Sequence, residues 1–329
     1  MPACTRRERS GDTLEEGCES MQAPAKTRIP LVVLLALTLA AAACAGCGEH
    51  GQHFRFVYMT DIHVQPERGG VEGFRAAVTR VNGLAPDFVI TGGDLVFDAL
   101  DVPFDRAVEL YRLYSEGCRE LKMPVHNTMG NHEVFGLYDT TGMSRLNGEY
   151  GKEMFKKRLG NGATCASFDH DGWHFIMLDV IHLADRHRYI GRADPEVIEW
   201  LRSDLARVRP ETPIVLSVHI PLVSVYEQIR KGACTALPPG EAVENSREIL
   251  DAFQGHDLRL VLQGHLHIYE NISFKNARFV TGGAVSGAWW EGSNEGFPEG
   301  FVVVDIDGGT INCRYETYGW DATKYDTAR

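Results

Sequence analysis

From residue 53 onward, apolar runs of strand length alternate with longer segments in which apolar residues recur every three or four positions. Residues 71–84 have the helical spacing, and they stand between strand-like runs at residues 54–59 and 87–91. The same order continues with a helix predicted at residues 107–121 and a strand at residues 124–128. This alternation predicts an α/β fold with a parallel sheet, because each crossover helix returns the chain to the same end of the sheet.

The second half of the chain adds a hairpin, two further helices and an antiparallel tail. Asp171 and Gly172 form a two-residue turn signal between strands predicted at residues 163–169 and 173–180. The other predicted elements are helices at residues 195–208 and 243–253, strands at 214–218 and 259–262, and antiparallel strands at 278–280, 301–306 and 310–316. Together these elements predict one domain over residues 53–329, in which two mixed sheets lie face to face with helices outside.

Residues 1–52 have a different pattern, and we expect them to be a leader followed by a short linker. Residues 29–43 are almost wholly apolar, and a run of roughly 15 residues is too short to span a hydrocarbon core of about 30 Å. Lys26 and Arg28 precede this run and small alanines close it, which is the layout of a secretory signal. The acidic residues before Met21 do not suit such a signal, so we expect translation to start at Met21.

The alanine run ends at Cys44, and this junction is similar to the lipoprotein box of exported bacterial proteins. We therefore expect export to the cell envelope, either as a lipoprotein anchored to the membrane through acylated Cys44 or as a periplasmic or extracellular protein cleaved after Ala43. An uncleaved membrane anchor is the other interpretation of the same residues.

Composition narrows the classes of function. The 329 residues are 44% hydrophobic, which is enough for one large domain. The formal net charge of −12 argues against a nucleic-acid-binding surface, because such surfaces are basic. It does not argue against a phosphate substrate, because bound metal ions supply the local positive field. If the protein is exported, four cysteines beyond the leader can form two disulfides: Cys118, Cys165, Cys234 and Cys313.

Five polar clusters each follow an apolar run, and they offer imidazole, carboxylate and carboxamide groups but no thiolate. This set suits two divalent or trivalent transition metal ions such as Mn, Fe or Zn, if one carboxylate bridges them. Two cations about 3.5–4 Å apart activate water and stabilise displacement at phosphorus. The clusters are Asp61-Ile62-His63, Gly92-Gly93-Asp94, Gly130-Asn131-His132-Glu133, His219 and Gly264-His265-Leu266-His267.

Each cluster alone has an ordinary interpretation. Gly92-Gly93-Asp94 is a common turn sequence, and a histidine such as His219 after an apolar run is more often a core or loop residue than a ligand. Period-2 spacing does place His265 and His267 on one side of an extended segment. The order of the clusters favours one shared site, because ligands collect beyond the carboxyl ends of the strands in such a sheet.

The clusters, from residue 54 to about residue 267, resemble those of the calcineurin-like metallophosphoesterases. The pattern of that family is Asp-x-His, Gly-Asp, Gly-Asn-His-(Asp/Glu), a later His and then Gly-His-x-His, and every part of it is present. The resemblance implies a four-layer α/β/β/α sandwich of two mixed sheets flanked by helices. It also implies the ligands, which are Asp61, His63 and His267 for a first metal ion, Asn131, His219 and His265 for a second, and Asp94 as the bridge.

The resemblance further implies that His132 is catalytic, because in the family this histidine faces the scissile phosphate and helps the leaving group depart. The expected reaction is hydrolysis of a phosphate ester by a hydroxide that a dinuclear metal centre activates. One position departs from the family. Phe97 stands where many members have a polar residue, which in protein phosphatases orients the catalytic histidine. We therefore expect His132 either to have another partner, with Glu133 and Asp98 as the candidates, or to act without one.

The expected substrate is a small phosphate ester, with a phosphodiester favoured over a phosphomonoester. A catalytically silent binding scaffold of the same fold is a third interpretation, and the complete ligand set argues against it. Trp289 and Trp290 are candidate substrate-binding residues, as a wall that stacks on a base or covers an apolar leaving group. The alternative is that both pack against the sheet. Their Gly-x-Trp-Trp stretch, followed by Pro-x-Gly-aromatic at residues 298–301, is similar to that of one bacterial branch of the family.

Overall fold

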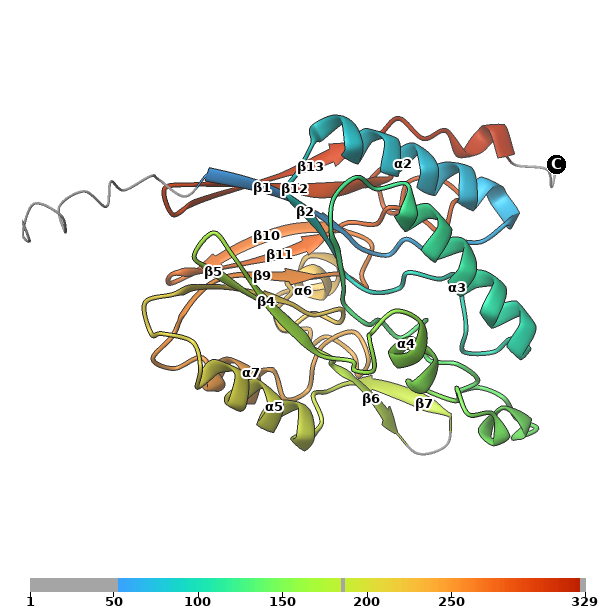
Figure 1. Cartoon of the computed structure of the whole chain (residues 1–329), viewed down its shortest axis with the longest axis horizontal. Coiled ribbons are helices and arrows are strands. Elements are labelled where there is room, and N and C mark those ends of the chain that lie inside the picture. The colour runs from blue at the N-terminus through green and yellow to red at the C-terminus, as the bar shows by residue number, and fades with distance from the viewer. Residues whose placement is uncertain (1–52, 185–186, 326–329) are drawn as a thin grey trace, which may run out of the picture. The chain divides into compact units, whose positions relative to one another are not determined.

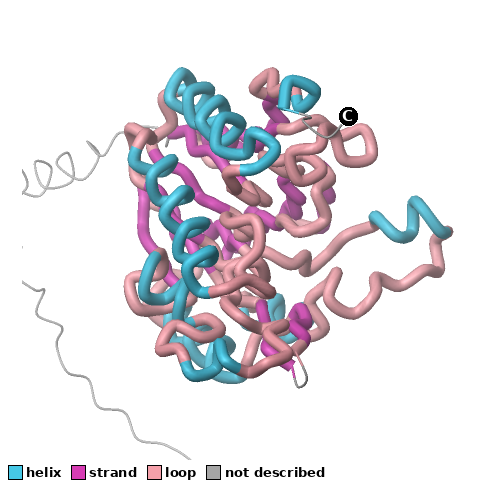
Figure 2. Tube along the Cα trace, turned by 90° about the vertical axis from the view of Figure 1, so that its right-hand side faces the viewer, coloured by secondary structure: helices cyan, strands magenta, loops and turns pink. Residues whose placement is uncertain are grey.

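Two β-sheets lie face to face at the centre of the fold, and helices cover their outer faces (Figure 1). The structure is a computed structural model that describes residues 53–184 and 187–325. The expected leader, with its start at Met21 and its acylation site at Cys44, lies outside the described residues. In Figure 2 the strands lie inside and the longer helices lie at the surface. This is the four-layer α/β/β/α sandwich that the resemblance implied.

The first sheet consists of five strands in the order β13 (Thr310–Thr317), β12 (Gly300–Asp307), β1 (His53–Met59), β2 (Phe88–Thr91) and β3 (Val125–Asn127). Strands β1, β2 and β3 run parallel, as the alternation of strands and helices predicted. They are connected by the helices α2 (Gly70–Leu84) and α3 (Phe104–Arg119). Strands β12 and β13 form a hairpin that extends the sheet in antiparallel fashion on the other side of β1.

The second sheet consists of six strands in the order β10 (Tyr269–Phe274), β11 (Ala277–Gly282), β9 (Asp257–Gln263), β8 (Pro213–Ser217), β5 (Trp173–Met177) and β4 (Ala166–His170). The four inner strands are parallel, and the two edge strands pair in antiparallel fashion with their neighbours. Helices α5 (Pro195–Leu205) and α7 (Ser246–Ala252) precede β8 and β9. In each sheet, the loops that follow the parallel strands therefore lie at one edge, beyond the carboxyl ends of these strands.

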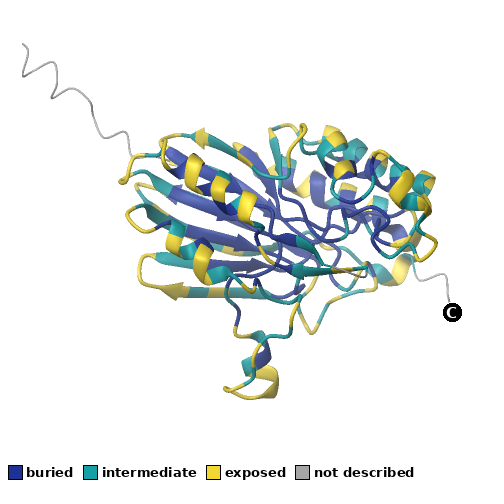
Figure 3. Cartoon of the chain, turned by 90° about the horizontal axis from the view of Figure 1, so that it is seen from below, coloured by how far each residue is buried: buried dark blue, intermediate teal, exposed yellow. Residues whose placement is uncertain are grey.

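Successive residues of β1 point into two different layers of the core. Phe56 belongs to the apolar cluster between the two sheets, whereas Val57 belongs to the cluster between the sheets and the helices. The ring of Phe56 stacks on Phe88 with 5.1 Å between centroids and meets Phe175 of the second sheet edge-on at 5.6 Å. Figure 3 shows the strands buried in the interior. This packing holds the two sheets in a fixed relation to each other.

Shorter elements lie between the strands and after the last one. After β5 comes a two-stranded hairpin of β6 (Ile181–Ala184) and β7 (Arg188–Gly191). The others are the 3-10 helices η1 (Glu67–Gly69), η2 (Met143–Leu146) and η3 (Ala322–Tyr325) and the helices α4 (Glu153–Arg158) and α6 (Tyr226–Lys231). Within residues 53–184 and 187–325, no helix is both long enough and apolar enough to cross a membrane.

Three details of the sequence prediction are wrong. Residues 278–280 are not part of an antiparallel tail, because they lie in β11 of the second sheet, parallel to β9. The intervening β10 was missed because this edge strand is only partly buried and lacks an apolar run. The helix predicted at residues 243–253 begins only at Ser246, and the amides of Val243 and Glu244 donate to the carbonyls of Pro221 and Gly191. The two disulfides are absent, since Cys118, Cys165, Cys234 and Cys313 are free.

Candidate metal centre

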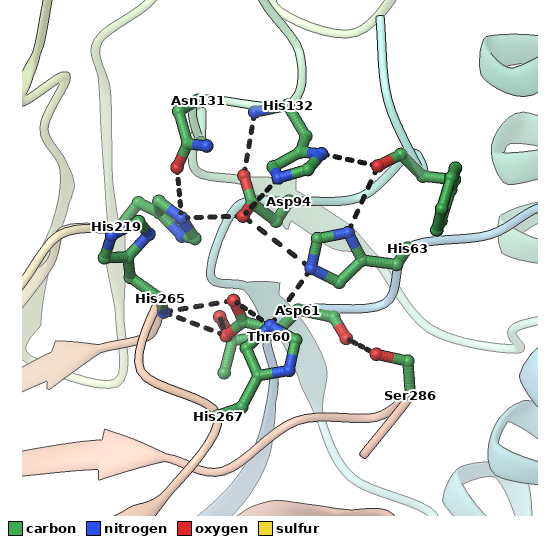
Figure 4. A network of polar contacts seen from close by, with 12 residues as sticks. Thr60, Asp61, His63, Asp94, Asn131, His132, His219, His265, His267 and Ser286 are labelled. Atoms are coloured by element: carbon green, nitrogen blue, oxygen red, sulfur yellow. Dashed lines mark hydrogen bonds and ion pairs between the residues drawn. The ribbon is translucent and has the colours of Figure 1, made fainter. Parts of the chain in front are cut away.

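The carboxyl ends of parallel strands from both sheets bring all of the predicted ligands to one place (Figure 4). The first sheet contributes through β1, β2 and β3, and the second sheet through β8 and β9. In chain order these strands lead to Asp61 and His63, to Asp94, to Asn131 and His132, to His219, and to His265 and His267. The shared position is the one expected for ligands in a sheet of this kind.

Several of these side chains are directed inward by an unusual backbone conformation. Positive φ angles, which are uncommon for residues other than glycine, occur at Asp61 (54°), His63 (46°), Asp94 (50°), His265 (71°) and His267 (55°). Each such residue costs of the order of 1–3 kcal/mol, and residues in this state concentrate at functional sites. The chain therefore maintains strained turns at the positions where the family pattern places ligands.

The first-metal group consists of Asp61, His63 and His267. The Nε2 atoms of His63 and His267 lie 3.1 Å apart, and Nε2 of His267 lies 3.3 Å from Oδ1 of Asp61. The Nδ1 atom of His267 lies 2.6 Å from the carbonyl oxygen of Gly287, and Nδ1 of His63 lies 3.4 Å from that of Phe97. Because a carbonyl can only accept, each Nδ1 carries the proton and each Nε2 presents a lone pair. Two lone pairs and a carboxylate that face one point fit a cation.

The second-metal group consists of Asn131, His219 and His265. The Nδ1 atom of His219 donates to the carbonyl of Gly92 at 2.8 Å, so its Nε2 presents a lone pair. That Nε2 lies 3.1 Å from Oδ1 of Asn131 and 3.1 Å from Oδ2 of Asp94. A ring nitrogen and two side-chain oxygens that face one point again fit a cation, which would take the place of a proton on Nε2. One ligand atom each of Asp94, His219 and His265 lie within 4.8 Å of one another.

Asp94 lies between the two groups. Its Oδ2 atom is 3.1 Å from Nε2 of His219 and 3.7 Å from Nε2 of His63. The carboxylate therefore reaches a ligand of each group with the same oxygen, which is the position that a bridging ligand occupies. The donor set has room for two cations with Asp94 between them.

The charges of the site favour cations. Burial disfavours the charged form of Asp94, but His219 and His132 outweigh burial and hold the pKa of this carboxyl well below its usual range. Burial opposes a charge on Asp61 as well, but His267 and His219 together outweigh burial and lower the pKa of this carboxyl. Burial opposes a charge on His219, yet Asp94 raises its pKa to about 9. Both carboxylates are therefore anionic inside a buried site, where a bound cation would replace the histidine protons that balance their charge.

His132 lies at the mouth of the site and not among the buried ligands. Its side chain is 22% exposed, and its Nε2 lies 3.8 Å from Oδ2 of Asp94. Its Nδ1 atom donates to the carbonyl of Phe97 at 2.5 Å, and its backbone amide donates to Oδ1 of Asp94 at 2.9 Å. The imidazole is therefore fixed at one edge and directs its other nitrogen toward the place where a substrate would meet the metals.

The expectation that Glu133 or Asp98 orients His132 is wrong, because the main chain of Phe97 does so. Oε1 of Glu133 accepts from the amides of Leu95 and Val96 at 2.7 and 3.2 Å. Its Oε2 accepts from the amides of Asp94 and Gly130 at 3.0 and 2.7 Å. Glu133 thus joins the loops after β2 and β3, and burial together with Asp94 raises its pKa to about 7. Asp98 instead accepts from the amide of Leu100.

A segment that the sequence motifs do not include supports the first-metal group. We call residues 286–290 the support segment. The hydroxyl of Ser286 donates to the carbonyl of Asp61 at 2.8 Å, and the carbonyl of Gly287 accepts from His267. The indole Nε1 of Trp290 donates to the carbonyl of His63 at 2.9 Å. Each member of the first-metal group is therefore held by one residue of this segment. The glycine-rich stretch at residues 282–287 was the available signal for it.

The structure separates the two tryptophans of the support segment. Trp290 is buried with 1% exposure, and its indole packs against α2 at Gly73. A Cβ atom added to Gly73 would come within 2.1 Å of the ring, so there is no room for a larger residue at that position. Trp289 is 41% exposed, and its ring centroid lies 4.6 Å from that of His267. The packing interpretation thus describes Trp290, whereas Trp289 stands beside the site.

A buried group of nitrogen and oxygen ligands around one shared carboxylate, with a histidine at its mouth, defines a dinuclear metallohydrolase. The chain belongs to the calcineurin-like phosphoesterase family, whose pattern matches residues 54–269. The protein is therefore a metal-dependent hydrolase of phosphoric ester bonds that acts on a small phosphate ester and has a site for two metal ions.

Two relatives agree with this class, and a solved structure shares the fold. A probable cyclic nucleotide phosphodiesterase of Rhodococcus erythropolis is 26% identical over 232 residues, which are 68% of this chain and 67% of that protein. Another, of Xenorhabdus bovienii, is 22% identical over 222 residues, which are 66% of this chain and 79% of that protein. The fold is similar to that of a dimetal phosphatase from Danio rerio, with a TM-score of 0.56 and 16% identity over 81% of this chain and 99% of that one.

Proposed function

We propose that the protein is a phosphodiesterase and that cyclic nucleotides are among its substrates. One observation carries the preference for diesters. Among the described hydrogen-bond and ion-pair partners of the predicted ligands and of His132, none is a lysine or an arginine. A monoester dianion carries one more negative charge than a diester, and this site adds no cationic side chain to balance it. The names of the two relatives support cyclic nucleotides.

His132 is proposed to act as the general acid. When bound, two cations supply an activated water and neutralise charge on the phosphoryl oxygens. Donation of Nδ1–H to the carbonyl of Phe97 fixes the ring and leaves Nε2 free to face the substrate. As the general acid the ring acts in its imidazolium form, in which Nε2 also carries a proton. That proton passes to the leaving ester oxygen when its bond to phosphorus breaks. Asn131 is suited to its predicted ligand position because a carboxamide oxygen binds a cation without adding negative charge.

The metals are proposed to be Mn, Fe or Zn. The donor set combines imidazole nitrogens with carboxylate and carboxamide oxygens and has no thiolate, which is the set these metals share. Metal analysis of the protein purified without added metal, followed by reconstitution of the stripped protein with each metal in turn, identifies the resident pair.

Matched substrates test the proposed activity. The metal-loaded protein is given bis(p-nitrophenyl) phosphate and p-nitrophenyl phosphate, which share a leaving group and differ in charge. It is then given 3′,5′-cyclic AMP and AMP. We expect higher kcat/KM for the diester of each pair and no activity after exhaustive chelation. Faster hydrolysis of both monoesters would make the protein a phosphomonoesterase, and no turnover of any of them with any metal would favour a silent scaffold.

We also propose that the protein is exported and attached to the membrane through acylated Cys44. The support is the order of Lys26 and Arg28, the apolar residues 29–43 and the alanine–cysteine junction. Two or more acyl chains would anchor it firmly, whereas one chain binds only marginally. Mass spectrometry of the native protein should find a mature chain that begins near Cys44. An intact chain beginning at Met1 in the cytosolic fraction contradicts export.

A further inference from the structure

We propose that Trp289 is an aromatic platform that selects phosphodiesters in which one of the esterified groups contains a planar ring, such as the base of a nucleoside. The proposal rests on the proposed phosphodiesterase activity and adds to it the part of the substrate that lies away from phosphorus. It assigns recognition to a residue outside the matched family region, which ends at residue 269.

The backbone holds Trp289 in a fixed place. Trp289 and Trp290 both lie in the left-handed region, with φ of 51° and 73°, which is a rare state for bulky residues. The turn that contains them is closed on both sides, because the amide of Trp290 donates to the carbonyl of Ser286 at 2.7 Å and that of Ala288 to Gly292 at 2.8 Å. Consecutive left-handed residues direct the two side chains differently, so that burial of Trp290 leaves Trp289 facing outward.

The indole of Trp289 lies against the first-metal group. Its centroid is 4.6 Å from the ring of His267, with 40° between the planes, and 6.0 Å from the ring of His63, with 56° between the planes. Both histidines are predicted ligands of the same cation. A phosphate held by the metals therefore has one ester group within reach of the indole.

A purely structural role does not account for this arrangement. Trp290 already provides the buried anchor of the segment, and its NH group is bonded to the carbonyl of His63. Trp289 remains 41% exposed, although solvent exposure of so large an apolar surface is unfavourable. A planar ring laid on the indole would remove that surface from water. Stacking of one base on an aromatic side chain contributes a factor of about 5–150 to affinity.

Binding of two phosphate ligands that are not diesters tests the platform without depending on turnover. AMP and ribose 5-phosphate have the same phosphate and sugar, and only AMP has a base. Isothermal titration of the metal-loaded protein should show AMP binding about 5–150-fold more tightly than ribose 5-phosphate. Trp289→Leu should remove this ratio and leave ribose 5-phosphate binding unchanged, whereas Trp289→Phe should retain part of it. Phe274→Leu is the matched control, because Phe274 is 65% exposed and lies at the end of β10.

The outcomes separate the platform from the activity. Equal affinity of the wild type for the two ligands, or a ratio unchanged in Trp289→Leu, overturns the platform even if cyclic AMP is hydrolysed. Equal weakening of both ligands by Trp289→Leu also overturns it, because the residue would then only shape the metal site. If AMP fails to bind the wild type at millimolar concentration, the platform is rejected as well. A ratio that depends on Trp289, in a protein that does not cleave diesters, supports the platform and rejects the phosphodiesterase.

Discussion

The first-metal group and the second-metal group contain the same kinds of ligand but have different supports. Asp61, His63 and His267 are each held by a residue of the support segment, which lies beyond the family region at residues 54–269. In the second-metal group, His219 is held by the carbonyl of Gly92, and the amide of His265 donates to the carboxylate of Asp61. Ligands and supports of the second group thus come from the family region itself. Loss of a contact made by the support segment should therefore weaken the first metal position more than the second.

Asp94→Asn should have the largest effect, because Asp94 is the one residue that both groups share. The change removes a negative charge from between two cations, so we expect turnover to fall by orders of magnitude and bound metal to fall below two per chain. Steady-state kinetics and elemental analysis measure the two effects. Asp251→Asn, at an exposed position of α7, is the control. Full activity of Asp94→Asn would show that the groups are independent sites without a bridge.

His132→Ala should come second, and it should leave both groups intact. We expect metal content to stay the same and turnover to fall by about 10²–10⁴-fold on diesters with alkoxide leaving groups, because the general acid is lost. The loss should be much smaller with a nitrophenolate leaving group, which departs without a proton. Equal losses on both kinds of substrate would mean that His132 does not protonate the leaving group.

Trp290→Phe should affect one group only. It keeps an aromatic ring in the core but removes the hydrogen bond to the carbonyl of His63. Loss of a partner that orients a ligand lowers metal affinity by about 10–100-fold, and we expect the lower end because this partner holds the backbone. In a stepwise metal titration, one of two affinities should fall.

Trp320→Phe is the matched control for this titration. Trp320 packs edge-on against Trp290, and within the described residues its buried Nε1 has no hydrogen-bond partner. The substitution therefore changes packing without removing such a bond. If Trp290→Phe and Trp320→Phe weaken both affinities alike, the support segment has no selective effect on the first-metal group.

His174→Gln should have the smallest effect on activity, because it lies in β5 outside both groups. Its imidazole lies between Oδ1 of Asp169 at 2.7 Å and Oδ2 of Asp204 at 2.8 Å, and Asp204 is also paired with Arg207. Burial opposes a charge on His174, but the two carboxylates prevail and its pKa is raised. Because the pKa of His174 is higher in the folded than in the unfolded protein, its charged form stabilises the fold at pH values below the unfolded-state pKa of about 6.5. This contribution is lost as the pH rises through the folded-state pKa.

The stability difference between wild type and His174→Gln should therefore shrink from pH 5.5 to pH 8.5. We expect about 1–3 kcal/mol at the lower pH, measured by urea unfolding, with kcat/KM unchanged at both. A difference that grows with pH would show that the imidazole is neutral in the folded protein.

The ligands could be predicted from the sequence because metal chemistry restricts which side chains can stand at a given position. A carboxylate such as Asp94 or a carboxamide such as Asn131 has few substitutes at a metal, so its place in the chain is a lasting signal. The alternation of strands and helices likewise identified β1, α2 and β2, because a buried layer requires periodic apolar residues. Strand β10 was not predicted, because it is an edge strand that is only partly buried and therefore does not require periodic apolar residues.

The supports that use the main chain could not be predicted. The carbonyl groups of Gly287 and Phe97 fix two imidazoles, and every residue has a carbonyl group. Nor does a Trp-Trp pair show which ring is buried. That choice follows from the left-handed turn and from the space above Gly73, which only the folded chain reveals.

One atom, the carbonyl oxygen of Phe97, meets Nδ1 of both His63 and His132. The two rings stand at 88° with their centroids 4.6 Å apart, so a predicted metal ligand and the proposed proton donor are aligned by the same main-chain oxygen. A displacement of that carbonyl would therefore shift both imidazoles together. Both hydrogen bonds use the main chain of residue 97, so neither requires the polar side chain that many members of the family have at this position.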